Sequence, residues 1–259
     1  MSATADQPHP TALFDLTGKV AIVTGGSRGL GREMALAFAA CGADVVIASR
    51  KLDNCEVVAA EVRTLGRRAL AAAYHAASWD DADTLADAAY AEFGRVDILV
   101  NNAGMSPLYE SVDSISEDLY DKVMGVNLKG PFRLSANIGA RMAAGDGGSI
   151  IFVSSVASQR PSPSEIVYGA AKAGVNNLTI GLARTFGPKV RVNCIVPGPF
   201  LTDISKAWDL ESFAKNARNG FALQRGGEPN EIVGAALYFA GAASSFTTGA
   251  WLNVDGGPR

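Results

Sequence analysis

Seven short apolar runs alternate with stretches of helical periodicity along almost the whole chain. The run VAIVT at residues 20–24 is continuous, apolar and rich in β-branched residues, which is typical of a strand buried on both faces of a sheet. The runs lie at residues 20–24, 44–48, 69–74, 97–101, 149–154, 190–196 and 251–254. Helical patterns occupy about residues 29–41, 52–65, 80–93, 115–143, 164–186 and 228–240. This alternation predicts an α/β chain: a single doubly wound, Rossmann-type domain with a seven-stranded parallel sheet.

The length of 259 residues suits one α/β domain better than two. Residues 1–12 are polar and contain proline, so we expect a flexible tail before a domain at residues 13–259. Residues 199–222 form an unusually long connection, which predicts a lid over a binding site. An ordinary helical excursion packed on the sheet is the alternative. The apolar side chains of this segment are Phe200, Leu201, Ile204, Trp208, Leu210 and Phe213.

Charge and composition exclude several classes of protein. The 23 Lys and Arg against 26 Asp and Glu give a formal charge of -3, with no basic excess for nucleic acid. The uncharged residues 232–254 are interrupted by Ser and Thr, so they fit a core helix and a strand better than a membrane span. Residues 1–12 lack the apolar core of a signal peptide, and the three cysteines form no C-x-x-C pair, so we expect a cytoplasmic protein. The histidines, His9 and His75, form no ligand cluster, so we expect no metal site.

A glycine-rich turn follows the first predicted strand and opens the first predicted helix. Its sequence from Thr24 is TGGSRGLG. Glycine removes the Cβ that would block a close approach, and a helix N-terminus offers free N–H groups to an anion. The turn is therefore a candidate pyrophosphate site, although glycines in such a turn can also serve packing alone. Its candidate residues are Gly25, Ser27, Arg28, Gly29, Leu30 and Gly31.

Tyr168 and Lys172 are four positions apart in a predicted helix. They should share one face of it, about 6 Å apart. A neighbouring ammonium favours the ionised phenol, so we expect the pKa of Tyr168 to fall below its ordinary value and suit acid–base chemistry. Taken alone, this pair is also common on amphipathic helices without any catalytic role.

Further motifs follow in order, and together they resemble the classical short-chain dehydrogenase/reductase family. The glycine turn is similar to the family's T-G-x3-G-x-G signature. After it come the NNAG sequence at residues 101–104, Asn127, Ser155, Tyr168-x3-Lys172, Pro197-Gly198 and DGG at residues 255–257. The resemblance covers roughly residues 14–257.

The resemblance implies a catalytic group of Asn127, Ser155, Tyr168 and Lys172. Tyr168 would exchange a proton with a carbonyl oxygen, Ser155 would hydrogen-bond that oxygen, and Asn127 would anchor a water that relays protons to Lys172. The neighbouring Ser154 is a rival, but the family's spacing to the tyrosine selects Ser155. The implied cofactor-binding residues are Gly25, Ser27, Arg28, Gly29, Leu30, Gly31, Ser49, Arg50, Asn102, Ala103, Gly104, Tyr168, Lys172, Pro197, Gly198 and Thr202, with Asn101 supporting the same floor.

The end of the second predicted strand indicates the cofactor. Dinucleotide folds place a carboxylate there for a ribose 2′-hydroxyl, or an Arg for a 2′-phosphate. This chain has Arg50, which with Arg28 could clamp a phosphate, so we predict NADP(H) in preference to NAD(H). The alternative is that both arginines are solvated surface charges. His75 stands near the position where the family commonly has an Asp beside the adenine, which leaves that contact open.

The substrate should be a small carbonyl compound or alcohol. The expected pocket is mostly apolar and suits a ketone or aldehyde of medium size, with Arg160 available for an anionic group. Its candidate residues are Met105, Leu108, Tyr109, Arg160, Phe200, Trp208 and Phe213, although the aromatic ones could simply pack the lid. Candidate substrates are 3-oxoacyl thioesters, sugar ketones, and steroid or xenobiotic carbonyls. A non-catalytic dinucleotide-binding regulator and an interaction scaffold are the alternatives.

Small residues at the start of the helix that carries Tyr168 would let another backbone approach closely. They include Gly169, Ala170 and Gly174. Members of the family often associate through such helices, so we expect a homo-oligomer, a dimer or a tetramer. Tight packing within the same chain is the alternative explanation for these residues.

Overall fold

The computed structural model describes residues 9–202, 205 and 209–258. Within this part the chain forms one parallel sheet of seven strands in the order β3-β2-β1-β4-β5-β6-β7. The strands are β1 (Val20–Thr24), β2 (Asp44–Ser49), β3 (Ala69–Ala73), β4 (Ile98–Asn101), β5 (Gly148–Val153), β6 (Val190–Pro197) and β7 (Trp251–Val254). Each matches a predicted run to within one residue at either end, so the doubly wound α/β fold is confirmed.

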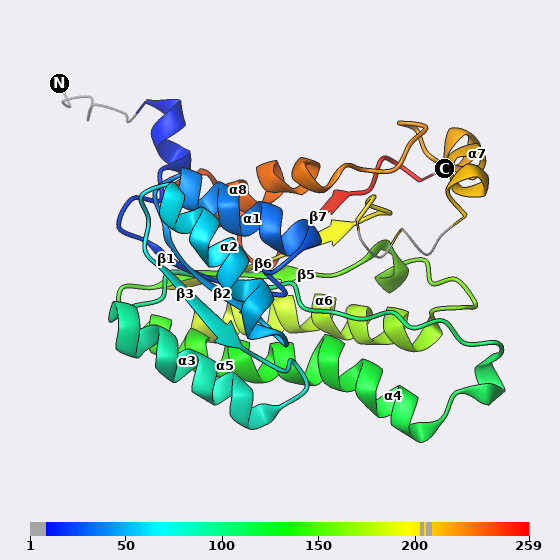
Figure 1. Cartoon of the computed structure of the whole chain (residues 1–259), viewed down its shortest axis with the longest axis horizontal. Helices are drawn as coiled ribbons and strands as arrows, with labels where there is room; N and C mark the ends of the chain where they lie inside the picture. Colours follow the sequence, from blue (N-terminus) through cyan, green and yellow to red (C-terminus); the bar gives the residue numbers. More distant parts are fainter. Residues whose placement is uncertain (1–8, 203–204, 206–208, 259) are drawn as a thin grey trace.

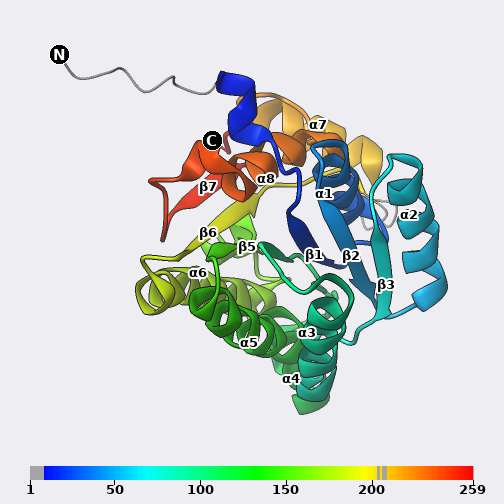
Figure 2. The same cartoon turned by 90° about the vertical axis from the view of Figure 1, so that its left-hand side faces the viewer.

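Helices cover the sheet in two layers, as Figure 2 shows. One layer buries Phe38 and Phe239 against the sheet, and the other buries Leu134 and Val175. The first layer holds α1 (Gly29–Ala40), α2 (Leu52–Thr64) and α8 (Val233–Ala240). The second holds α3 (Trp79–Phe93), α4 (Glu117–Met124), α5 (Gly130–Ala144) and α6 (Ile166–Phe186).

Shorter helical segments join these elements. The 3-10 helices are η1 (Pro10–Phe14), η2 (Val112–Ser114), η4 (Val156–Ser158), η6 (Pro229–Ile232) and η7 (Ala242–Ser244). Residues 10–12, which we assigned to the tail, thus belong to η1. The predicted lid contains α7 (Leu210–Gly220), which lies beside the C-terminal end of the chain (Figure 1), where Phe221 forms a bridge with Pro258. Ile204 and Trp208 fall outside the described residues.

The long helix predicted at residues 115–143 is interrupted. A π-helical turn, η3 (Gly125–Lys129), separates α4 from α5. Pro131 has no N–H to donate to the preceding turn, so a regular helix cannot continue through it. Gly130 lies so close to the Ala76 carbonyl that a Cβ would come within 1.5 Å of its oxygen. The interruption matters because it carries Asn127.

The carboxyl ends of β1 and β4 mark the point where the chain order reverses. β1 lies between β2 and β4, and the chain continues from β1 into the first helical layer and from β4 towards the second. Open parallel sheets bind ligands in the crevice outside such a switch point. The glycine turn, the segment after β4 and the segment after β5 all lie at this end of the sheet.

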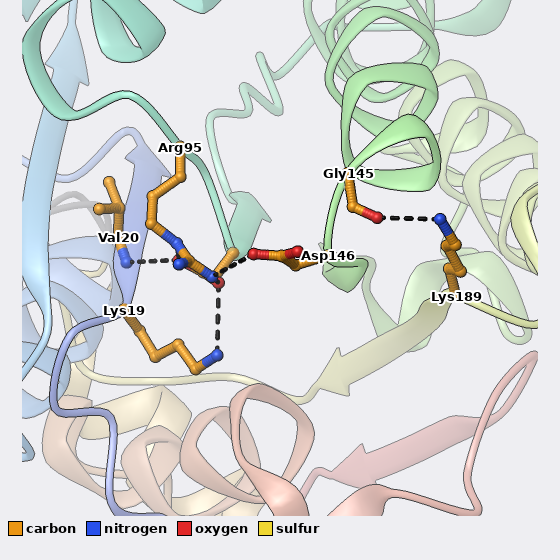
Figure 3. Close-up of polar contacts among 7 residues, drawn as sticks. Lys19, Val20, Arg95, Gly145, Asp146 and Lys189 are labelled. Carbon is orange, nitrogen blue, oxygen red and sulfur yellow. Dashed lines mark hydrogen bonds and ion pairs between the residues drawn. The ribbon is translucent and has the colours of Figure 1, made fainter.

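The opposite end of the sheet is fastened by a buried carboxylate. Asp97, 6% exposed, accepts hydrogen bonds from the Val20 backbone N–H at 3.0 Å and from Arg95 at 2.6 and 2.9 Å. Figure 3 shows Lys19 and Arg95 converging there, with Asp146 on the far side of the guanidinium. This carboxylate therefore ties the start of β1 to the start of β4, away from the crevice.

Replacing Asp97 by alanine is expected to destabilise the fold by about 2 kcal/mol, because the buried Val20 N–H loses its acceptor. Urea unfolding followed by circular dichroism measures the change. Asp146→Ala is the matched control, since that side chain contacts the same Arg95 at 3.6 Å but is 84% exposed, and it should change stability by less than about 0.5 kcal/mol. Equal losses in the two variants would contradict the assignment of the buried carboxylate as the fastening group.

Candidate active site

Tyr168 and Lys172 lie in the first two turns of α6, next to the carboxyl end of β5. The Lys172 Nζ is 5.6 Å from the centroid of the Tyr168 ring, so the two side chains share one face of the helix as predicted. Lys172 is 3% exposed, and its Nζ donates to the Val153 carbonyl at 2.8 Å. The amine is thus held between the end of β5 and the phenol.

Ser155 lies in front of the same phenol. It precedes η4, and its Oγ accepts a hydrogen bond from the Ala157 N–H at 3.1 Å. Its hydroxyl lies close enough to the phenol to lower the pKa of Tyr168. Ser154 points elsewhere, because its buried Oγ donates to the Lys172 carbonyl at 3.2 Å. The geometry therefore favours Ser155 over its rival.

The expected fall in the pKa of Tyr168 is wrong for the protein by itself. Burial raises the pKa of its phenol to about 12; the Ser155 hydrogen bond acts in the lowering direction, and the charge of Glu165 raises it further. Burial also lowers the pKa of Lys172 to about 8. The spacing on the helix correctly predicted that Lys172 lies beside Tyr168. It could not predict the burial of the phenol, which raises its pKa.

Asn127 projects from the π-helical turn and holds the segment after β4. Its Nδ2 donates to the carbonyls of Met105 at 2.8 Å and Val123 at 2.9 Å, and its Oδ1 accepts from the Met105 N–H at 3.2 Å. A Cβ at Gly104 would lie 3.0 Å from that Oδ1 and 3.5 Å from the Lys172 Nζ, so glycine lets the segment lie flush against both. The proton relay through a water at Asn127 stays a prediction.

The glycine turn is held from behind by the segment after β4. The Thr24 Oγ1 accepts from the N–H groups of Asn102 and Ala103 at 3.0 and 3.1 Å. The Asn102 amide donates to the Thr24 and Gly25 carbonyls at 3.0 and 3.3 Å, so this predicted cofactor residue supports the turn. A Cβ at Gly31 would come within 2.3 Å of the Gly25 carbonyl oxygen. Only glycine therefore allows the helix to pack this closely against the turn.

The start of α1 fits an anionic group. Gly29 has a positive φ of 53°, and among the described residues no side chain caps the first turn that it shares with Leu30. Free N–H groups at a helix N-terminus with room for close approach are what a pyrophosphate requires. The residues present therefore fit a dinucleotide at this turn.

Arg28 and Arg50 leave from turns that lie next to each other. β1 pairs with β2 up to Thr24 and Ala48, and the Ser27 and Ser49 hydroxyls hydrogen-bond at 2.9 Å. Both arginines are exposed, and neither forms an ion pair with another described residue. Strand pairing therefore places the two turns that carry these arginines side by side.

The opposite wall of the crevice comes from the segment after β6. A Cβ at Gly198 would come within 2.7 Å of the Asp255 Cα, and the Gly198 N–H donates to the Val254 carbonyl at 3.0 Å, so this turn packs flush on the end of β7. Thr202 reaches the glycine turn, with its methyl carbon 3.6 Å from the position of a Cβ on Gly29. Pro197 ends β6, so the predicted residues of this segment all lie along the crevice.

This arrangement is accompanied by a family match. The chain matches the family model of the short chain dehydrogenases over residues 19–212. It belongs to the short-chain dehydrogenase/reductase family. This short-chain dehydrogenase/reductase is 38% identical over 250 residues to L-rhamnose 1-dehydrogenase (NAD(P)(+)) of Azotobacter vinelandii, with 93% of this chain and 97% of the relative covered.

Solved structures of the family are similar over almost their whole length. The 7α-hydroxysteroid dehydrogenase complexed with NADH and 7-oxo glycochenodeoxycholic acid has a TM-score of 0.92 at 32% identity, covering 96% of this chain and 98% of that one. The 3-oxoacyl (acyl-carrier-protein) reductase of Agrobacterium tumefaciens with NADP bound has a TM-score of 0.91 at 30% identity, covering 98% and 99%. This protein is therefore an oxidoreductase of the short-chain dehydrogenase/reductase family. Within the described residues, no helix has the length and apolar character needed to cross a membrane.

Several residues expected to line the substrate pocket are engaged in packing. Phe200 is 7% exposed and belongs to the core, and the Arg160 guanidinium donates to the Pro258 carbonyl at 3.5 Å. A Cβ at Gly226 would lie 3.1 Å from the Phe213 ring, so Phe213 packs beside that turn. The Tyr109 hydroxyl donates to the Pro163 carbonyl at 2.9 Å and accepts from the Ile166 N–H at 2.8 Å.

Behind Tyr168 lies a narrow cavity that sequence reasoning missed. Its walls come from the segment after β4, from α4 and from the start of α6, which are distant in sequence, so no local motif could have found it. The lining residues are Pro107, Tyr109, Ile115, Leu119, Tyr120, Val123, Glu165, Val167 and Tyr168. Met105 is half-buried and Leu108 is 81% exposed.

His75 lies on the surface after β3. Its backbone N–H donates to the Asp81 carboxylate at 2.8 Å, and its carbonyl accepts from the Ser78 N–H at 2.8 Å. These bonds fix the backbone of the turn and leave the imidazole exposed. A contact between His75 and an adenine stays open.

Proposed function

We propose that this chain is an NADP(H)-dependent oxidoreductase that interconverts a carbonyl group and a secondary alcohol, with Tyr168 as the general acid and base. The observation that carries the proposal is the grouping of one phenol, one hydroxyl and one amine at the carboxyl end of β5. These three groups can supply a proton, a hydrogen bond and a positive charge to a single oxygen atom.

Reduction requires a proton donor, and the phenol of Tyr168 can act as one. With its pKa raised to about 12, it stays protonated across the neutral range. Ser155 lies beside this phenol and would donate to the same substrate oxygen as negative charge develops. Lys172, with its pKa lowered to about 8, keeps most of its charge at neutral pH and favours the phenolate left after proton transfer. A nicotinamide dinucleotide, when bound, would supply the hydride.

The residues proposed to hold the dinucleotide surround the crevice. The N–H groups at Gly29 and Leu30 would bind the pyrophosphate, and Lys172 would hold the nicotinamide ribose. Arg28 and Arg50, free of described ion pairs and joined through the Ser27–Ser49 contact, support a 2′-phosphate and hence NADP(H). Some related structures contain NADP and another contains NADH, so this preference depends on the arginines of this chain.

The alternative is a regulator that binds the dinucleotide without chemistry. The presence of Asn127, Ser155, Tyr168 and Lys172 in one cluster argues against it, because binding alone does not require a phenol beside a buried amine. The deciding experiment compares thermal shifts with NADPH and NADH, and then follows cofactor absorbance with a panel of carbonyls and alcohols. Stabilisation by the cofactor without turnover of any panel member would favour the regulator.

The proposed substrate is a carbonyl compound of medium size. Relatives act on a sugar, an oxidised steroid and a 3-oxoacyl group by their names, so the panel should contain all three classes. Arg160 already donates to the Pro258 carbonyl, which weakens the expectation that it binds an anionic substrate. If Arg160 does bind such a group, Arg160→Ala will raise KM for anionic substrates selectively.

We also propose a homo-oligomer, a dimer or a tetramer. The small residues of α6 do not support it, since a Cβ at Gly169 would lie 2.7 Å from the Ala157 carbonyl oxygen and one at Gly174 would lie 2.9 Å from Leu128. Support comes from the edge strand β7, where Trp251 and Leu252 are 45% and 37% exposed. Light scattering should give a mass that is a multiple of 26.9 kDa, and a monomer mass would reject the proposal.

A further inference from the structure

A third polar side chain continues the catalytic face of α6. Tyr168, Lys172 and Asn176 follow one another at four-residue intervals, so each lies one turn beyond the last. Asn176 is 4% exposed, and no step of the mechanism above uses it. A buried amide has to be hydrogen-bonded to be tolerated, so its partners indicate its role.

On one side, the Asn176 amide reaches the segment that carries Ser155. Its Nδ2 donates to the Ser158 Oγ at 2.9 Å, and that hydroxyl donates to the Ser155 carbonyl at 2.6 Å. The Ser158 N–H donates to the same carbonyl at 3.0 Å. The peptide of Ser155 is therefore held on α6 through one hydroxyl and one amide.

On the other side, a buried thiol fixes the orientation of the amide. The Cys194 Sγ, on β6, donates to the Asn176 Oδ1 at 3.6 Å. Cys194 is fully buried and lies opposite Phe152 of β5 in the sheet. Burial raises the pKa of this thiol to about 12, so it keeps the proton that it donates. The same thiol also lies 3.5 Å from the Ile195 carbonyl, whereas the Asn176 and Ser158 donors both point towards Ser155.

We propose that Asn176, acting through Ser158, is a positioning residue that holds the Ser155 hydroxyl against Tyr168. The proposal rests on the proposed function, because it assigns a role within that catalytic group. Its physical basis is that η4 joins β5 to α6, and that Asn176 adds a side-chain hydrogen bond between this segment and α6 to the packing of Val156 and Ala157. The Asn176 amide bonds this segment to the helix that presents the phenol.

The pKa of the Tyr168 phenol depends on the titratable groups that surround it. They are Lys172 on α6 and Glu165 just before it, with Tyr109 and Tyr120 lining the same cavity as Tyr168. The Ser155 hydrogen bond lowers the pKa of Tyr168 and the charge of Glu165 raises it. Loss of alignment at Ser155 should therefore raise this pKa, whereas Glu165→Gln should lower it in the same assay.

The test uses Asn176→Ala and Ser158→Ala in the full-length protein. Both should shift the basic limb of the kcat profile upward by about 0.5 to 1 pH unit, the equivalent of one weakened hydrogen bond. Both should lower kcat by about 5- to 10-fold and change the KM for cofactor by less than about 2-fold. Ser158→Thr keeps the hydroxyl and should restore the wild-type profile. Asn177→Ala is the matched control, because it removes an exposed asparagine from the next position of the helix.

A second readout does not depend on turnover. Replacing every tyrosine by difluorotyrosine lowers the pKa of each phenol and allows its titration to be followed by fluorine NMR. The resonance that is missing from the spectrum of Tyr168→Phe is assigned to Tyr168. Its midpoint should move upward in Asn176→Ala and Ser158→Ala, and downward in Glu165→Gln. Loss of thermal stability in the two alanine variants with unchanged midpoints would overturn the proposal. Absence of turnover by the wild type would reject the proposed function, and the fluorine titration would still decide the role of Asn176.

Discussion

Tyr168→Phe is expected to lower kcat for carbonyl reduction by about 10²- to 10⁴-fold, the usual contribution of a positioned general acid. The substitution removes the phenolic oxygen, and with it the proton that the proposed reduction needs. The ring still fills the same space beside Lys172, so folding and cofactor binding should be retained. Steady-state assays with one verified carbonyl substrate, combined with a thermal shift on adding NADPH, measure the two effects separately.

The matched control is Tyr120→Phe. Tyr120 lines the same cavity but is 47% exposed and lies on α4, away from Lys172. It should keep kcat within about 3-fold of the wild type, as expected for a residue outside the chemistry. The mechanism is wrong if Tyr168→Phe reduces the same substrate at the wild-type rate.

The direction of the pH dependence follows from the pKa of Tyr168. A phenol with a pKa of about 12 in the protein by itself remains a competent acid over the whole neutral range, so reduction should not lose rate as pH rises through 7. Alcohol oxidation needs the same group as a base and should accelerate as pH rises. A flat pH profile for reduction and a rising one for oxidation across the neutral range are therefore expected.

Strand patterning predicted most of this fold. A continuous apolar run such as VAIVT is typical of a strand in a sheet covered on both faces, and each predicted run is found in the sheet within one residue of its predicted bounds. The break at η3 was missed, because helical periodicity continues through Gly130 while the tight contact with Ala76 comes from a segment far away in sequence. Local pattern cannot report such a contact.

For the candidate site too, the sequence predicted the features that depend on local spacing and missed those that depend on contacts between distant segments. The four-residue spacing gave the shared face of Tyr168 and Lys172, since a helix converts spacing directly into proximity. Asn176 lies one more turn along the same face. Its role could not be predicted from the sequence, because its partners Ser158 and Cys194 come from η4 and β6 and meet it only in the folded protein. The rise in the pKa of Tyr168 was equally out of reach, because burial is produced by the whole fold.

Arg50→Ala is expected to weaken NADPH binding by about 10- to 100-fold, while NADH binding changes by less than about 3-fold. A charge-assisted hydrogen bond to phosphate contributes about 1.5 to 3 kcal/mol, and NADH lacks the 2′-phosphate that would receive it. Titration of each cofactor by isothermal calorimetry measures both constants. The difference between the two cofactors should shrink as salt is added, because exposed charges are screened.

Arg63→Ala is the matched control for that prediction. It removes the same unit of charge from an exposed arginine near the far end of α2, where the guanidinium pairs with Glu56 at 3.3 Å. If the effect of Arg50 is local, Arg63→Ala will leave both constants near the wild type, because a charge beyond the Debye length of about 8 Å contributes little at physiological salt. Equal weakening of NADPH and NADH by Arg50→Ala would contradict the phosphate clamp, since a general loss of affinity cannot come from a group that contacts only the 2′-phosphate.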